Sequence, residues 1–160
     1  MINKKTFYTK LVLLLLLPLL LSCNNNKKTN NKTQEINDTI IINKKNSPFI
    51  IKENFIVDSS TFLIIEKGSE IIISDSLNIE IYGKLLINGS NKNKVVLKSV
   101  ADSISWGRII LKSNYKVIIE NTDFFNGAIT AHNNKLNINN CNFVFTHNRP
   151  FDGYPIIYYI

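Results

Sequence analysis

The chain has 160 residues, of which 19 are Lys or Arg and 12 are Asp or Glu, so its formal net charge is +7. This length allows a single folded domain once any targeting segment is set aside. The 26 Ile and 24 Asn residues, within 44% hydrophobic residues, favour β-strands and argue against global disorder. Two cysteines are too few for a disulfide framework.

The first 22 residues have the pattern of an export signal. Lys4, Lys5 and Lys10 form a positively charged start, and residues 11–21 are an almost pure leucine run. As a helix this run would span roughly 16 Å, about half of the hydrocarbon core of a bilayer. The segment therefore predicts a cleaved signal peptide rather than a membrane-spanning helix.

Leu20-Leu21-Ser22-Cys23 follows at the end of the run and resembles the lipobox of bacterial lipoproteins. The resemblance implies cleavage before Cys23, acylation of its thiol and new amino group, and a location in the cell envelope. Each buried CH₂ group of such an anchor contributes about 0.8 kcal/mol. We expect an outer-membrane lipoprotein, with the periplasmic or surface leaflet left open. The alternative is an ordinary signal peptide that happens to precede a cysteine.

Cleavage removes three lysines and no acid, which lowers the net charge to +4. The remaining basic residues are scattered and do not alternate with aromatic residues, so a nucleic-acid partner is not expected. Residues 23–47 are mostly Asn, Lys and Thr, apart from an apolar island at Ile40–Ile42. This composition predicts a flexible tether between the lipid anchor and a domain over residues 48–160.

The domain consists of short β-branched runs separated by polar turns. Ten such runs predict an all-β chain without helices of ordinary length. The expected strands are Asn54–Val57, Thr61–Glu66, Glu70–Ile73, Leu77–Tyr82, Lys84–Ile87, Lys94–Lys98, Arg108–Leu111, Lys116–Glu120, Lys135–Asn139 and Pro155–Ile160.

Internal repeats decide what kind of all-β fold this is. Lys116–Phe124 aligns without gaps on Lys135–Phe143, and Lys94–Ser99 resembles both as an expected third copy. A second series begins at glycines and recurs with a similar period, at Gly83, Gly107, Gly127 and Gly153. Two series with one period indicate at least two strands per repeat, which is typical of a parallel β-helix of four to five coils.

Stacking of the coils places equivalent residues above one another. We expect Ile119 over Ile138 and Phe124 over Phe143 inside the cylinder. Asn121 and Asn140 should form an asparagine ladder at a turn, which is a structural role. Cys141 is expected as a small, unreactive thiol, because nothing near it in sequence would lower its pKa.

Four motifs in order resemble the opening coils of bacterial right-handed parallel β-helix proteins of the pectate-lyase-like type. They are Leu63–Ile71, Ile81–Ser90, Lys94–Ser99 and Trp106–Ile109. The resemblance covers roughly residues 54–145 and implies the fold. It does not imply one chemistry, since lyases, hydrolases, adhesins and stalks share such coils. Arg108 and Lys94 depart from the glycine and proline that are usual in that family.

A catalytic or metal site would need acids gathered on one sheet. Asp102, Glu120, Asp123 and Asp152 are scattered, and the first repeat's Glu120 and Asp123 become Asn in the next. A glycoside hydrolase would need two carboxylates on one face, and Asp123 with Asp102 is the one pair to consider. The turn at Asp102 is too irregular for the repeat to predict its position. We therefore expect no metal, no cofactor and no catalytic residue in this chain.

The densest polar cluster comprises His147, Arg149, Asp152 and Tyr154. These side chains could bind a sugar or an anionic group, although Arg-Pro and Asp-Gly are also turn dipeptides. Trp106 is a candidate for sugar stacking if it is exposed, and otherwise a packed anchor at a coil corner. His132 is expected at the surface.

The sequence after Gly153 shows no capping element for a last coil, so further coils or a C-terminal domain are expected. Two functions remain open. The first is a lipid-anchored, non-enzymatic scaffold or stalk that presents its turns to a glycan or protein partner. The alternative is the N-terminal part of a polysaccharide lyase or glycoside hydrolase.

Overall fold

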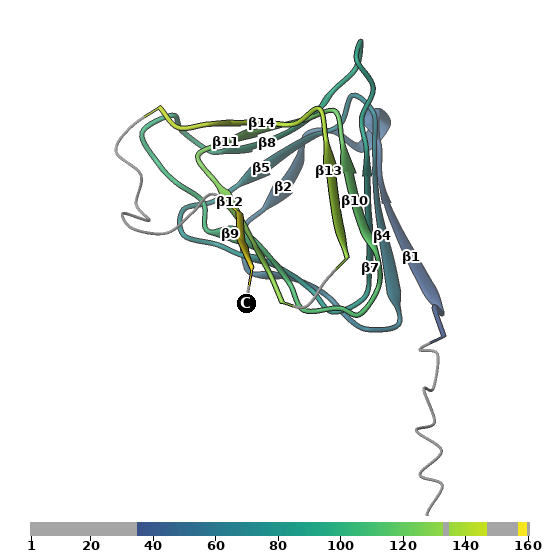
Figure 1. Cartoon of the computed structure of the whole chain (residues 1–160). Helices are drawn as coiled ribbons and strands as arrows, with labels where there is room; N and C mark the ends of the chain where they lie inside the picture. The colour runs from purple at the N-terminus through teal and green to yellow at the C-terminus, as the bar shows by residue number, and fades with distance from the viewer. Residues whose placement is uncertain (1–34, 133–134, 147–156, 160) are drawn as a thin grey trace, which may run out of the picture. The chain divides into compact units, whose positions relative to one another are not determined.

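A computed structural model describes residues 35–132, 135–146 and 157–159 of the chain (Figure 1). These residues form three five-stranded sheets in which all neighbouring strands are parallel. Sheet A contains β1 (Asp38–Ile42), β4 (Thr61–Glu66), β7 (Lys84–Asn88), β10 (Val117–Glu120) and β13 (Leu136–Asn139). Sheet B contains β2 (Phe49–Ile51), β5 (Glu70–Ile73), β8 (Val95–Ser99), β11 (Thr122–Phe125) and β14 (Asn142–Val144). Sheet C contains β3 (Phe55–Val57), β6 (Ile79–Ile81), β9 (Arg108–Leu111), β12 (Ala128–Ala131) and β15 (Ile157–Tyr159).

Every third strand returns to the same sheet, so each coil contributes one strand to sheets A, B and C in turn. The strands enclose a three-sided cylinder of about five coils (Figure 1). The parallel β-helix predicted from the repeats is confirmed, and the described part of the chain contains one 3₁₀ turn, at Lys44–Asn46, and no α-helix. No helix in that part is long and apolar enough to cross a membrane.

Side chains alternate between the cylinder interior and its surface along most strands, as in β4 and β7. The interior residues of successive coils lie above one another. Ile119 pairs with Ile138, and Phe124 pairs with Phe143, whose ring stacks on it with centroids 4.6 Å apart and planes 4° apart. Both predicted apolar ladders are therefore confirmed.

The asparagine ladder is also confirmed. Asn121 and Asn140 adopt left-handed backbone conformations, with φ of 47° and 51°, which asparagine tolerates better than most residues. The Asn140 Nδ2 amide donates to Asn121 Oδ1, and Asn121 Nδ2 donates to the carbonyl of Gly89 at 3.1 Å. The ladder thus reaches one coil further than predicted. A Cβ on Gly89 would lie 2.1 Å from the Asn121 carbonyl, so this rung requires glycine.

The tether prediction is wrong for its last ten residues. Asp38–Ile42 forms β1 and pairs with β4 in register, and the 3₁₀ turn follows it. The apolar island supplies the reason, since Ile42 is 1% exposed and stacks beside Ile65 in the core. Five strand residues were enough to join the sheet although the segment around them is polar.

Two repeat assignments are also wrong. Lys94–Ser99 was aligned with Lys116–Asn121, but β8 stacks between β5 and β11 in sheet B. The strand after Gly83 belongs to sheet A, whereas those after Gly107 and Gly127 lie in sheet C. The alternation of apolar residues is the same on all three sheets, so it cannot say which sheet a strand joins. Gly153 lies outside the described residues.

Three strands were not predicted in addition to β1, namely β2, β11 and β14, and β12 was predicted only as the strand after Gly127. β10 and β11 are separated by Asn121 alone, and a single left-handed residue turns the chain through the corner. Such a corner leaves no run of turn residues by which the sequence could signal it.

Candidate functional site

Most of the predicted site residues lie outside the described part of the chain. These are Cys23, the expected lipidation site, and His147, Arg149, Asp152 and Tyr154, the expected binding loop. Their roles remain predictions. His132 is half-buried, and its backbone amide donates to the carbonyl of Leu111.

Trp106 is a packed anchor and cannot stack on a sugar. Its side chain is 0% exposed, and its Nε1–H group donates to the carbonyl of Phe125 at 2.8 Å. A Cβ on Gly127 would lie 2.0 Å from the indole ring, so glycine is needed where the next coil passes over it. The proposal of Trp106 as a stacking residue is therefore corrected to the structural alternative.

Of the acids considered for chemistry, Asp123 forms the contacts that are clearest, and Asp152 lies outside the described residues. Lys94 Nζ and Asn142 Nδ2 both donate to Asp123 Oδ1 at 2.7 Å, which joins three coils of sheet B. The backbone carbonyl of Asp102 accepts a hydrogen bond from Asn126 Nδ2. Within the described residues, no three His, Cys, Asp or Glu side chains lie close enough to hold a metal ion.

Other charges on the sheets also form pairs between coils. On sheet C the Lys112 ammonium donates to Glu80 at 2.8 Å and to the Tyr82 hydroxyl at 2.9 Å. The hydrogen bond from Lys112, followed by that from Tyr82, lowers the pKa of the Glu80 carboxyl, and the same contacts raise the pKa of Lys112. On sheet B, Lys98 contacts Glu70. The partners in these pairs lie on neighbouring coils of one sheet, so the stacking of the coils accounts for the contacts.

Cys141 is half-buried and forms no disulfide with a residue that the structure describes. Its Sγ atom lies 3.3 Å from the carbonyl of Asn139, and burial raises the pKa of the thiol. A raised pKa reduces the fraction of reactive thiolate. The predicted role as an unreactive structural cysteine is consistent with this environment.

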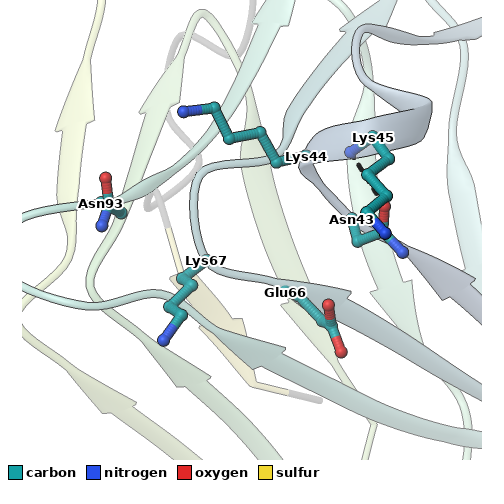
Figure 2. Close-up of a pocket in the computed structure, with 6 residues that line it drawn as sticks. All are labelled: Asn43, Lys44, Lys45, Glu66, Lys67 and Asn93. Carbon is teal, nitrogen blue, oxygen red and sulfur yellow. Dashed lines mark hydrogen bonds between the residues drawn. The ribbon is translucent and has the colours of Figure 1, made fainter.

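The candidate site is formed by turns that join sheet A to sheet B, a place that sequence reasoning missed. A hollow of about 410 Å³ there is lined by Asn43, Lys44, Lys45, Glu66, Lys67 and Asn93 (Figure 2). A second hollow of about 380 Å³ shares Glu66 and Lys67 and continues to Asn88, Gly89 and Ser90. We call the two together the corner groove.

The corner groove is shaped by two local features. Asn43 caps the 3₁₀ turn by accepting a hydrogen bond from the Lys45 amide at 2.9 Å, which directs Lys44 and Lys45 outward. One coil later Gly68 has a φ of 76°, which favours glycine, and its open side faces the Lys44 stem. Ile42 of β1 pairs with Ile65 of β4, and Lys44 and Lys67 each lie two residues further along the chain. The two lysines therefore occupy equivalent positions in successive turns.

Three lysines and one glutamate give the first hollow a positive charge. No ion pair joins Lys44, Lys45 or Lys67 to a carboxylate among the described residues, in contrast to Lys94, Lys98 and Lys112. The asparagine amides beside them can donate and accept hydrogen bonds. This lining suits a ligand that carries negative charge together with hydroxyl or carbonyl groups.

Comparison of the chain with models of protein families, with curated proteins and with solved structures gave no match.

Proposed function

We propose that this protein is a lipid-anchored, non-enzymatic scaffold of the cell envelope that presents its turns to a glycan or protein partner. The observation that supports it is the corner groove, where Lys44, Lys45 and Lys67 are exposed and form no ion pair with any residue that the structure describes. Elsewhere on the surface, Lys94, Lys98 and Lys112 pair with carboxylates of a neighbouring coil. Unpaired cations beside polar hollows are available for a partner.

Binding is favoured over catalysis by the state of two carboxylates on the sheets, those of Asp123 and Glu80. A lyase or glycosidase of this fold would need carboxylates free to bind a metal ion or to transfer a proton. The Asp123 carboxylate is neutralised by Lys94, and the Glu80 carboxyl has a lowered pKa in contact with Lys112. A low pKa suits a fixed ion pair rather than a proton donor near neutral pH.

The test uses the acylated full-length product in detergent on a glycan array and in crosslinking to isolated cell envelopes. Lys67→Glu should weaken binding by at least about tenfold, because it reverses a charge shared by both hollows. Lys116→Glu is the matched control, since Lys116 is also exposed and does not line the groove. Binding that Lys67→Glu leaves unchanged, or no binding at all, would contradict the proposed role of the groove.

The anchor is tested separately by metabolic labelling with palmitate. We expect label on the wild-type chain and none on Cys23→Ala. Label that persists in Cys23→Ala would remove the lipid-anchor part of the proposal while leaving the binding experiment intact.

A further inference from the structure

We infer that the partner of the corner groove is an acidic glycan, a sugar chain that carries carboxylate or phosphate groups, and not a protein. This inference rests on the proposed function and deepens it, since it names the class of partner that the groove binds. Three features of the groove support it: the side chains that meet at Gly68, the polar groups that the fold leaves available, and the composition of the lining.

Turns of three successive coils meet at Gly68. A Cβ on Gly68 would lie 3.6 Å from Lys44 Cδ of the first coil and 3.7 Å from Asn93 Cβ of the third. The Gly68 amide also donates to the carbonyl of Asn93 at 3.2 Å. In Figure 2 the ammonium ends of Lys44 and Lys67 extend on the same side of the hollow as Asn93. Two cations and one amide therefore border a space that the glycine leaves open.

The wall of the groove that comes from the third coil is held in place by hydrogen bonds. The Asn93 amide donates to the Ser90 carbonyl at 3.1 Å, and the Ser90 amide donates to the Asn93 carbonyl at 3.0 Å. Asn140 Nδ2 donates to Asn91 Oδ1 at 2.9 Å, which ties the same turn to the asparagine ladder. A groove whose wall is already ordered loses less conformational entropy when a ligand binds.

Positive charge prevails at this corner after the nearby acids are counted. Lys94 is neutralised by Asp123. The other lysines in the turns from sheet A to sheet B are exposed and form no ion pair with a described residue: Lys44, Lys45, Lys67 and Lys92. The acids at the adjoining ends of the sheet A strands are Glu66 and Glu120. Four cations against two acids leave a local excess that attracts an anionic partner.

The groove also offers groups that suit hydroxyls. The side-chain amides of Asn88 and Asn93 and the carboxylate of Glu66 form no hydrogen bond with a residue that the structure describes. Amides donate and accept, and a carboxylate accepts, so together they match the hydroxyls of a sugar ring. The ammonium groups of Lys44 and Lys67 can only donate, which matches carboxylate or phosphate oxygens. One ligand that satisfies both sets is a sugar with an acidic group.

The lining excludes the features on which other macromolecules depend. Neither hollow is lined by an aromatic residue or by Leu, Ile, Val or Met. Protein interfaces are centred on aromatic and arginine anchors, with lysine depleted from their cores. Single-stranded nucleic acids stack their bases on aromatic rings. A neutral sugar would also find no ring to stack on, so we expect binding to depend on the acidic groups.

The two hollows fit a chain of sugars better than a single small anion. They share Glu66 and Lys67, and the second continues to Asn88 and Ser90 one turn later. Successive coils stack at about 4.8 Å, so a ligand that fills both hollows extends along the solenoid axis. Lys67 borders both parts of such a ligand, and its substitution should have the largest effect on affinity.

The test titrates the full-length protein in detergent with four probes and measures affinity by calorimetry. Tetragalacturonate carries carboxylates, and a phosphorylated oligomannose carries phosphate. The methyl ester of the first and the dephosphorylated form of the second are the neutral counterparts. We expect at least one acidic probe to bind at least about tenfold more tightly than its neutral counterpart, and its affinity to fall as salt is added. The probe that binds identifies the acidic group.

Variants then locate the binding. Lys67→Gln should weaken the affinity for that probe at least about tenfold, and Asn93→Ala about threefold through the loss of one hydrogen-bonding amide. Lys52→Gln is the matched control, because Lys52 is an exposed lysine of the first coil that does not line the groove. Its affinity should stay within about twofold of the wild-type value. Circular dichroism shows whether each variant is folded.

Equal affinity for acidic and neutral probes, no binding of either acidic probe, or binding that Lys67→Gln leaves unchanged would overturn the inference. Crosslinking to cell envelopes separates this failure from that of the proposed function. A crosslink to an envelope protein that Lys67→Glu abolishes, without glycan binding, would keep the groove as a binding site and make its partner a protein. Neither glycan binding nor a crosslink would remove both.

Discussion

The first and fifth coils close the same cylinder but carry different outer surfaces. In the first coil the outward positions include Ile50 and Ile56, both more than half exposed. In the fifth coil they include Asn137 and Asn142, which are exposed and uncharged, and Val144, which is 39% exposed. Identical strand geometry therefore does not require identical outer residues, and the two ends of the cylinder differ in how exposed their outer apolar residues are.

The interiors of the two coils are more alike. Phe49 and Phe55 of the first coil meet edge to face with centroids 5.8 Å apart, and both are half-buried. Phe143 of the fifth coil is also half-buried and stacks on Phe124, which is 0% exposed. The core is thus filled in the same manner towards both ends, and what distinguishes them lies on the outside.

The largest expected effect comes from the anchor between the third and fourth coils. Trp106→Ala should lower the free energy of unfolding by about 3–5 kcal/mol, because it leaves a cavity under Gly127 and an unpaired carbonyl at Phe125. In a solenoid this loss is local, so hydrogen exchange should rise more in β9–β14 than in β1–β6. Urea unfolding and hydrogen–deuterium exchange measure the two effects.

The matched control is Val100→Ala, which truncates a side chain that is 50% exposed in the loop before Trp106. It should change stability by less than about 0.5 kcal/mol. Equal exchange in all coils of Trp106→Ala would mean that the first and last coils unfold as one unit, and would weaken the comparison between them.

A second prediction compares one side chain at two depths of the same ladder. Phe124→Ala should destabilise by about 2 kcal/mol more than Phe143→Ala, because Phe124 is fully enclosed and Phe143 is half-buried. Chemical denaturation of both variants gives the difference. Equal losses would show that the ring of Phe143 is as well covered as that of Phe124, so the fifth coil would not behave as an end.

The gapless repeat is the part of the fold that the sequence predicts best. Lys116–Phe124 and Lys135–Phe143 differ by one regular coil, so their alignment correctly pairs Ile119 with Ile138. Earlier coils are longer and have unequal turns, as Leu86 pairs with Ile118, and sequence similarity there cannot separate the three sheets. Regular stacking is visible in a sequence only while the turns keep a constant length.

The corner groove was missed for a related reason. Lys44 and Lys67 come together only because β1 pairs with β4, and β1 is a five-residue strand inside a polar segment. Turn residues carry no periodic signal of their own, so their juxtaposition depends on register. For Trp106 the sequence allowed two interpretations, a sugar-stacking residue or a packed anchor. Its complete burial confirms the packed anchor.

A third prediction concerns the ladder that connects the third coil to the fifth. Asn121→Ala should destabilise by about 1–2 kcal/mol, because alanine disfavours a φ of 47° and cannot donate to Gly89. Asn121→Gly should recover part of the loss by accepting the backbone conformation without the amide. If both variants are equally destabilised, the side-chain ladder alone accounts for the effect, and the left-handed turn contributes nothing.

The smallest expected effect bears most directly on the difference between the two ends. Ile50→Ser and Ile56→Ser should each change the free energy of unfolding by less than about 0.5 kcal/mol in detergent, because both side chains are more than half exposed. The same substitutions at the interior positions Ile51 and Val57 are the controls, and should destabilise by about 3 kcal/mol or more through burial of a hydroxyl and loss of volume. Urea titrations of the four variants measure the contrast. A near-neutral result would show that Ile50 and Ile56 do not stabilise the fold, which leaves a contact outside the domain as their role. A loss above about 1 kcal/mol for Ile50→Ser or Ile56→Ser would instead make these side chains part of the fold, and the outer difference between the first and fifth coils would follow from packing alone.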